Sequence, residues 1–299
     1  MSDFPKFVEI HEEGPREGFQ IEPGPISTVD KIKLIDALSK TGLKHIQACS
    51  FVNPRLVPGW ADAEQVVEGF MAHDGVEYTG LYFNGNGLDR ALAFKDKLTI
   101  SGSISLTASE GFTKKNLNRT HEENMSAMKR HVTSHLELGI PVNRIGVMAA
   151  FGCYYEGDIS PDTVVKTLRD GMAIAQETGA EITLFSLADT MGWAAPHRIE
   201  KVIGEVRSVW PNIDISLHLH DTRGLAIANA YSALKMGISR FDSTVGGLGG
   251  CPFAGQPKAA GNICTEELVL LCEELGISTG VDLDQLIDCL LYTSPRPRD

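Results

Sequence analysis

Two histidines in the segment LHLHD, His218 and His220, have the residue type and the spacing of a metal site. Alternate residues of a β-strand point to the same face, so both imidazoles would lie on one side of a strand near its C-terminal end. Two converging imidazoles can bind one divalent ion, and imidazole suits zinc, manganese or iron. A pair of hydrogen-bonded core histidines is the alternative, which so short a motif leaves open.

The glycine-rich segment GGLGGCPFAGQPKAAGN carries two more candidate residues. Glycines let a loop approach a ligand closely and close over it, although their spacing here does not match the dinucleotide-binding motif. Cys251 could exchange a proton with a ligand, and Asn262 could offer its amide oxygen to a metal. A thiol that only packs and an asparagine that only caps a helix are the structural alternatives.

Charged residues in two other segments could act on the same ligand. EEGPREG contains Arg16, which could stabilise an enolate oxygen, and Glu17, whose carboxylate could bind a metal. SEGFTKKNLN contains Lys114 and Lys115, whose ammonium groups could hold phosphates. Each pair could also be ordinary solvated charge.

Short β-branched runs that alternate with helical patterns must position these residues. This alternation is typical of βαβ units and a parallel sheet. Eight strands with room for a helix between them favour a (β/α)8 TIM barrel over a doubly wound sheet. The predicted strands are residues 7–11, 45–51, 76–83, 98–106, 144–151, 181–189, 214–221 and 240–245.

Polar segments such as HEEGPRE, QACSF, SLADT and HLHD occur where these strands end. A barrel builds its active site at the C-terminal strand ends, so the pattern predicts one site there. Ser27 or Thr28 is expected to cap a helix that ends before Gly42, and Ser160 a helix that ends before Gly179. We predict a single catalytic barrel over residues 1–290 and a non-native or disordered tail at 291–299, which is rich in proline and arginine.

The composition excludes several classes of function. Aspartate and glutamate number 39 against 27 lysines and arginines, a net charge of −12 that disfavours nucleic acid as a partner. The sequence shows neither a signal peptide nor a long apolar run, so we expect a cytosolic protein without membrane contact. The six cysteines form no CxxC pair, which argues against disulfides and a zinc knuckle.

Together these segments resemble the 3-hydroxy-3-methylglutaryl-CoA lyase family, a group of metal-dependent TIM-barrel lyases related to Claisen synthases. The resemblance runs from about Phe7 to Leu290. GPREGFQIE resembles the family's GPRDGLQNE, SFVNPRLVPGWAD its SFVSPKWVPQMAD, and SEGFTKKNLN its SExFxKKNIN. HLHDTRG, FDSTVGGLGGCPFA and GNICTEELV complete the match, and several ordered motifs are more specific than any one alone.

The resemblance implies a role for each matching residue. It assigns stabilisation of the enolate to Arg16, proton donation to Cys251 and a catalytic role to His218. The metal ligands that it implies are Glu17, His218, His220 and Asn262. The residues that it places near the substrate are Gln47, Ser50, Lys115, Asn116, Asp189, Thr190 and Arg223.

The sequence also departs from the family pattern. Glu17 replaces an aspartate ligand, and Gln47 replaces the glutamate of the family's IEATSF, so that one negative charge is lost. Glu13 stands where the family usually has an apolar residue and could restore that charge. Arg223 replaces a tyrosine, and the glycine loop is two residues longer, with Lys258 in the insertion.

These features predict a metal-dependent carbon–carbon lyase that cleaves a 3-hydroxy-3-methylglutaryl-CoA-like thioester to an acetyl-CoA-type enolate and a keto product. Mg²⁺ or Mn²⁺ is the expected cofactor, and the expected partner is a small acyl-CoA or a related 3-hydroxy acid. A Claisen-type synthase and a non-catalytic homologue that binds metal or acyl-CoA are the alternatives. A homodimer is the default assembly for such barrels.

Overall fold

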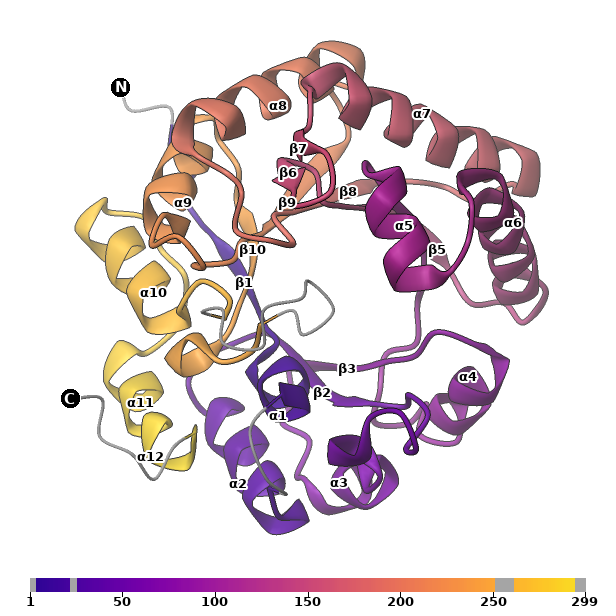
Figure 1. Cartoon of the computed structure of the whole chain (residues 1–299). Coiled ribbons are helices and arrows are strands. Elements are labelled where there is room, and N and C mark those ends of the chain that lie inside the picture. The colour runs from indigo at the N-terminus through magenta and orange to yellow at the C-terminus, as the bar shows by residue number, and fades with distance from the viewer. Residues whose placement is uncertain (1–3, 22–25, 251–260, 294–299) are drawn as a thin grey trace. The chain divides into compact units, whose positions relative to one another are not determined.

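The computed structural model describes residues 4–21, 26–250 and 261–293 (Figure 1). Its residue contacts divide the chain into two compact units. We name Ser101–Arg240 the central unit, and we name Lys6–Ile100 with the described residues after position 240 the terminal unit. Cys251, Lys258 and the tail from position 294 lie outside the described residues.

The strands of each unit form a run of hydrogen-bonded neighbours. In the terminal unit the order is β3-β2-β1-β10, and in the central unit it is β9-β8-β5-β4. Within each unit, neighbouring strands such as β1 and β2, or β5 and β8, pair in parallel. The bounds of these strands are β1 Glu9–Glu12, β2 His45–Ser50, β3 Glu77–Leu81, β4 Gly102–Thr107, β5 Val142–Met148, β8 Leu184–Ala188, β9 Asp214–His218 and β10 Arg240–Ser243.

Helices follow nearly every strand. In the central unit, α6, α7, α8 and α9 are neighbours in succession outside the strands (Figure 1). The helices of this unit are α5 Glu110–Leu117, α6 His121–Glu137, α7 Pro161–Thr178, α8 Pro196–Val209 and α9 Ala226–Lys235. Those of the terminal unit are α1 Phe19–Ile21, α2 Thr28–Leu38, α3 Ala63–Gly69, α4 Gly85–Leu92, α10 Thr265–Glu274, α11 Leu283–Asp288 and α12 Leu290–Thr293.

Local sequence explains where the two predicted helices begin and end. Ser27, rather than Thr28, caps α2, because its side chain accepts a hydrogen bond from the Asp30 amide. Ser160 caps α7 in the same way, and α7 ends at Gly179, whose positive φ of 80° suits glycine. The apolar side of α7, with Val164 and Leu168, is fully buried.

All eight predicted strands are present, and the differences lie at their ends. The last predicted strand of the central unit is shorter than expected, because β9 ends at His218 and leaves His220 just beyond it. A short antiparallel hairpin of β6 (Gly152–Cys153) and β7 (Gly157–Asp158) was not predicted. The five cysteines of the described residues are buried and free. Within that same part of the chain, no helix is long and apolar enough to cross a membrane.

A buried carboxylate, Glu12, joins the end of β1 to the segments around β10 and α10. It accepts hydrogen bonds from the amides of Gly14 and Val245 at 2.7 and 2.9 Å and from Thr265 Oγ1 at 2.6 Å. Burial raises the pKa of Glu12 from its ordinary 4.5 to about 7, although the three hydrogen bonds lower it. This network anchors the segment that follows β1.

The pKa of Glu12 predicts a pH dependence of stability. Between pH 4.5 and about 7 the folded chain holds a proton that the unfolded chain has released, so stability falls as pH rises through this window. Glu12→Gln keeps the two hydrogen bonds from the backbone amides, reverses the direction of the one with Thr265, and removes the titration. The free energy of unfolding of the wild type, relative to Glu12→Gln, should therefore fall as pH rises from 4.5 to 7, by about 1.4 kcal/mol per unit of pKa difference. The difference between the two melting temperatures, measured across this pH range, reports that fall. Exposed Glu68→Gln is the control, and a constant difference would contradict the prediction.

Candidate active site

Arg16 and Glu17 lie on a π-helical turn, Gly14–Gly18, directly after β1. Arg16 is largely buried, and its Nη2 donates to Glu13 Oε2 at 2.5 Å and lies 3.0 Å from Glu17 Oε2. Its Nε donates to Oε1 of Gln47, in the middle of β2. The structure thus brings together Arg16, Glu17 and Gln47, three of the predicted site residues, and adds Glu13 to them.

The surroundings of Arg16 keep it charged and fixed in position. Burial opposes its charge, but the carboxylates of Glu13 and Glu17 outweigh that effect and raise its pKa. The indole nitrogen of fully buried Trp60 donates to the Arg16 carbonyl oxygen at 3.0 Å. Among the described residues, Nη1 of Arg16 has no hydrogen-bond partner, so this N–H pair can meet a ligand oxygen.

Asn262 lies beside Glu17 in the terminal unit. A methyl group built at Gly249 would lie 2.8 Å from Asn262 Nδ2 and 2.9 Å from Glu17 Cγ, so one glycine separates the two side chains. The Asn262 amide nitrogen donates to the Leu248 carbonyl at 3.4 Å. Its Oδ1 is buried and, within the described part of the chain, accepts no hydrogen bond.

The central unit positions the two histidines and Asp189 at its own strand ends. His218 ends β9, and the His218 and His220 rings lie 5.0 Å apart at their centres. Nδ1 of His220 lies 2.9 Å from the Asp189 backbone carbonyl oxygen. A carbonyl oxygen can only accept a hydrogen bond, so Nδ1 is the donor and carries the proton. The neutral imidazole of His220 therefore carries its lone pair on Nε2, the tautomer that a metal ligand needs.

The Asp189 carboxylate is buried, and only one of its two oxygens accepts hydrogen bonds from the described residues. Its Oδ1 accepts from the amides of Trp193 and Ala194 at 2.6 and 3.0 Å. Its Oδ2 is buried without a partner among the described residues. Burial raises the pKa of Asp189 to about 6, against the lowering effect of these amides, His220 and Arg223. The Arg223 guanidinium lies 4.1 Å from the centre of the Trp193 ring.

Other predicted residues have different surroundings. Thr190 Oγ1 accepts from the amide of Ala149, a non-glycine residue with a positive φ of 54°, so Thr190 supports the strained end of β5. Ser50 is fully buried at the end of β2, and its hydroxyl has no partner in the described chain. Lys115 and Asn116 lie on α5, where Lys115 is exposed and Asn116 is partly buried.

Three unpartnered buried oxygens bear on ligand binding. They belong to Ser50, Asp189 and Asn262, each of which the sequence analysis had singled out. A buried polar atom without a hydrogen bond costs about 1–3 kcal/mol, so native proteins use such atoms for ligands, ions or water. In the terminal unit the Asn262 oxygen and the Glu17 carboxylate, and in the central unit the Nε2 lone pair of His220, are donor types that divalent cations accept.

Comparison with known proteins connects this arrangement to a family. The sequence matches the HMGL-like family over residues 7–290. The chain belongs to the HMGL-like family. It is 39% identical to hydroxymethylglutaryl-CoA lyase of Bacillus subtilis over 95% of this chain and 91% of the relative. It is 40% identical to the human mitochondrial hydroxymethylglutaryl-CoA lyase, over 96% of this chain and 85% of the relative.

Solved HMG-CoA lyase structures share its fold. The Bacillus subtilis HMG-CoA lyase superposes with a TM-score of 0.86 at 37% identity, over 97% of this chain and 93% of that one. An HMG-CoA lyase from Acinetobacter baumannii, solved with coenzyme A and 3-methylmalate, gives 0.83 at 37% identity, over 97% and 90%. These similarities confirm the predicted (β/α)8 barrel fold.

Sequence reasoning missed residues that support the HMGL-like site without touching a ligand. Trp60 donates a hydrogen bond to the Arg16 carbonyl, and Glu12 accepts one from the Gly14 amide just before Arg16. The Trp193 ring packs against the Arg223 guanidinium. Trp60 lies inside the family-like motif SFVNPRLVPGWAD, so a signal was present, but its partner is far away in sequence. Gly249 belongs to the glycine loop, and only the structure shows which side chains it separates.

Gly249→Ala should weaken metal binding without removing a ligand atom. The new methyl group would push Glu17 and Asn262 apart, and metal ligands tolerate displacements of only about 0.5 Å. We expect at least a tenfold loss of affinity for Mn²⁺, measured by calorimetry. Gly139→Ala is the matched control, because Gly139 has a similar positive φ of 70° but nothing within 4 Å of the added methyl group. Equal Mn²⁺ affinity in both variants would refute the expectation.

Proposed function

We propose that this chain is a metal-dependent carbon–carbon lyase that cleaves a 3-hydroxyacyl-CoA thioester of the 3-hydroxy-3-methylglutaryl type. The observation that carries the proposal is the buried Arg16 guanidinium, which has one N–H pair open and lies beside the Glu17 carboxylate at the end of β1. An arginine and a metal ligand side by side suit a reaction that creates an enolate from a chelated substrate.

Glu17, His218, His220 and Asn262 would hold the cation, with Mg²⁺ or Mn²⁺ as the expected ion. The support is the unpartnered Asn262 oxygen, the His220 tautomer and the position of Glu17, His218 and His220 at or just beyond the ends of β1 and β9. In a (β/α)8 barrel these ends meet at one face. When bound, the cation would acidify the substrate 3-hydroxyl and fix the substrate carboxylate.

Arg16 would stabilise the thioester oxygen as C2–C3 cleavage turns it into an enolate. Three groups of the chain, Glu13, Glu17 and Gln47, hold the guanidinium in place through Nη2 and Nε, so Nη1 needs no reorganisation during the reaction. Removing one such donor typically lowers kcat about 10²–10³-fold. The role of Cys251 as the proton donor stays a prediction, because this residue lies outside the described residues.

Glu13 would supply the negative charge that Gln47 lacks. Both side chains bond to the same guanidinium, Glu13 through Nη2 and Gln47 through Nε. Moving the carboxylate from β2 to the segment after β1 keeps the charge on Arg16 but changes where it lies relative to the substrate. The acyl group that this arrangement selects stays open, as do the predicted cytosolic location, the homodimer and the single domain over residues 1–290.

Turnover of a panel of 3-hydroxyacyl-CoA thioesters with Mg²⁺ or Mn²⁺ tests the proposal. Cleavage to acetyl-CoA and a keto product would support it. Condensation of an acyl-CoA with a keto acid would indicate a synthase instead. Binding of coenzyme A thioesters without any turnover would indicate a non-catalytic homologue and would refute the proposal.

Removal of the metal should lower both stability and activity. A ligand at 100 times its Kd stabilises the folded state by about 2.7 kcal/mol, and for a chain of this size each kcal/mol shifts the melting temperature by about 2–4 °C. We therefore expect Mg²⁺ or Mn²⁺ to raise the melting temperature of EDTA-treated protein by several degrees. His218→Ala/His220→Ala should lose this shift, and an unchanged shift in that variant would exclude these histidines as ligands.

Gln47→Glu should lower activity on the native substrate. A third carboxylate at Arg16 would repel those of Glu13 and Glu17, and such repulsion costs about 1.4 kcal/mol or more, the equivalent of one pKa unit. If this cost falls on the transition state, the rate drops about tenfold. The double variant Glu13→Val/Gln47→Glu restores the number of charges and should recover activity relative to either single variant. A gain of activity in Gln47→Glu alone, from an inactive wild type, would identify the chain as a disabled lyase.

A further inference from the structure

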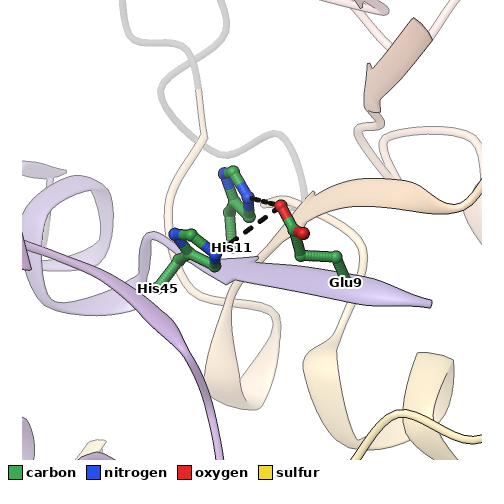
Figure 2. A group of neighbouring side chains, drawn as sticks. All are labelled: Glu9, His11 and His45. Carbon is green, nitrogen blue, oxygen red and sulfur yellow. Dashed lines mark hydrogen bonds and ion pairs between the residues drawn. The ribbon is translucent and has the colours of Figure 1, made fainter. Parts of the chain in front are cut away.

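A second group of imidazoles and carboxylates lies on neighbouring strands of the terminal unit, from Glu9 and His11 on β1 to His45 at the start of β2. Figure 2 shows His11 of β1 and His45 of β2 directed toward the carboxylate of Glu9, on one side of β1. The Glu9 Oε1 atom lies 2.7 Å from Nε2 of His11 and 3.6 Å from Nε2 of His45. The two rings are stacked, with centres 4.2 Å apart and planes inclined by 27°.

Strand register brings these side chains together. Glu9 and His11 are alternate residues of β1 and therefore share a face. The register pairs His11 with His45 across β1 and β2, and His45 with Glu77 across β2 and β3. Because neighbouring strands lie about 4.8 Å apart, their paired side chains are within reach of a single ion.

Each imidazole faces a further carboxylate with its other nitrogen. Nδ1 of His45 lies 3.3 Å from Glu77 Oε2, and Nδ1 of His11 lies 3.8 Å from Asp242 Oδ1. The His45–Glu77 distance is within hydrogen-bond range, whereas the His11–Asp242 distance is that of an ion pair only. A carboxylate hydrogen-bonded to Nδ1 favours the tautomer whose Nε2 carries the lone pair. Metal-binding histidines almost always have such a partner.

We propose that Glu9, His11 and His45 form a binding site for a divalent transition-metal cation such as Zn²⁺ or Co²⁺. Donor atoms held about 2.1 Å from one ion lie about 3–3.5 Å from one another. The observed separations of 2.7 and 3.6 Å from Glu9 Oε1 bracket that range, so small side-chain rotations are sufficient. Two imidazoles select transition metals over Mg²⁺, which prefers oxygen ligands.

Charge and access also favour a cation. The carboxylates of Glu9, Glu77 and Asp242 face two imidazoles that are neutral when they bind a metal, which leaves an excess of negative charge for the ion to balance. The His11, His45 and Glu9 side chains are each 27–28% exposed, so an ion can reach them from solvent. The site lies two residues before Gln47 on β2, about 7 Å along the strand, and does not depend on the proposed lyase activity.

Cobalt binding to EDTA-treated His218→Ala/His220→Ala protein tests the site, because this background removes the histidine pair of the proposed lyase site. Co²⁺ should bind at one ion per chain, with the visible absorption of coordinated cobalt, and Zn²⁺ should displace it. Adding Glu9→Gln, which is nearly isosteric, should weaken Co²⁺ binding at least tenfold. Adding His11→Val/His45→Val, which places strand-favouring β-branched residues at both positions, should weaken it at least a hundredfold.

His121→Ala is the matched control in the same background. His121 also bonds a carboxylate, Asp170 at 3.0 Å, but has no second imidazole beside it, so its loss should leave Co²⁺ affinity unchanged. Glu77→Gln should weaken binding about 10–100-fold, as outer carboxylates do. Co²⁺ affinity that is unchanged in Glu9→Gln, or no Co²⁺ binding in the background variant, would overturn the proposal. Neither result depends on whether the chain cleaves a thioester.

Discussion

A buried guanidinium needs carboxylates around it, and the architecture after β1 follows from meeting that need for Arg16. An unpaired charge in the protein interior costs several kcal/mol, so the segments that pack against a buried guanidinium must supply partners for it. Here Glu13 and Glu17 come from the same turn, and Gln47 comes from the neighbouring strand. The result is a cation whose position is determined from three sides while one N–H pair stays available.

Two interactions behind this cation explain why the turn can be so unusual. The π-helical conformation of Gly14–Gly18 is rare, and it persists because its ends are held. Glu12 accepts the Gly14 amide on one side, and Trp60 donates to the Arg16 carbonyl on the other. Since both residues are fully buried, changes at these positions should act through the placement of Arg16.

The alternation of side chains along β1 and β2 connects the two sites inferred for this chain. His45 and Gln47 are alternate residues of β2 and point to the same face of that strand. Glu9 and His11 are related in the same way on β1, and successive positions on this face form successive layers. The level of His11 and His45 carries imidazoles beside carboxylates, and the next residues on this face, Glu13 and Gln47, are partners of Arg16. Polar residues in successive layers replace the branched apolar residues that usually fill a barrel.

The sequence by itself determined the order of strands and helices, the helix cap at Ser160, and the family to which the chain belongs. These features rest on local periodicity and short motifs, which neighbouring residues specify together. Only the tertiary structure decided that Glu13 meets Arg16 beside Gln47, that Gly249 separates Glu17 from Asn262, and that His11 pairs with His45. Strand register and turn geometry set such contacts, and both depend on packing between segments that are distant in the sequence.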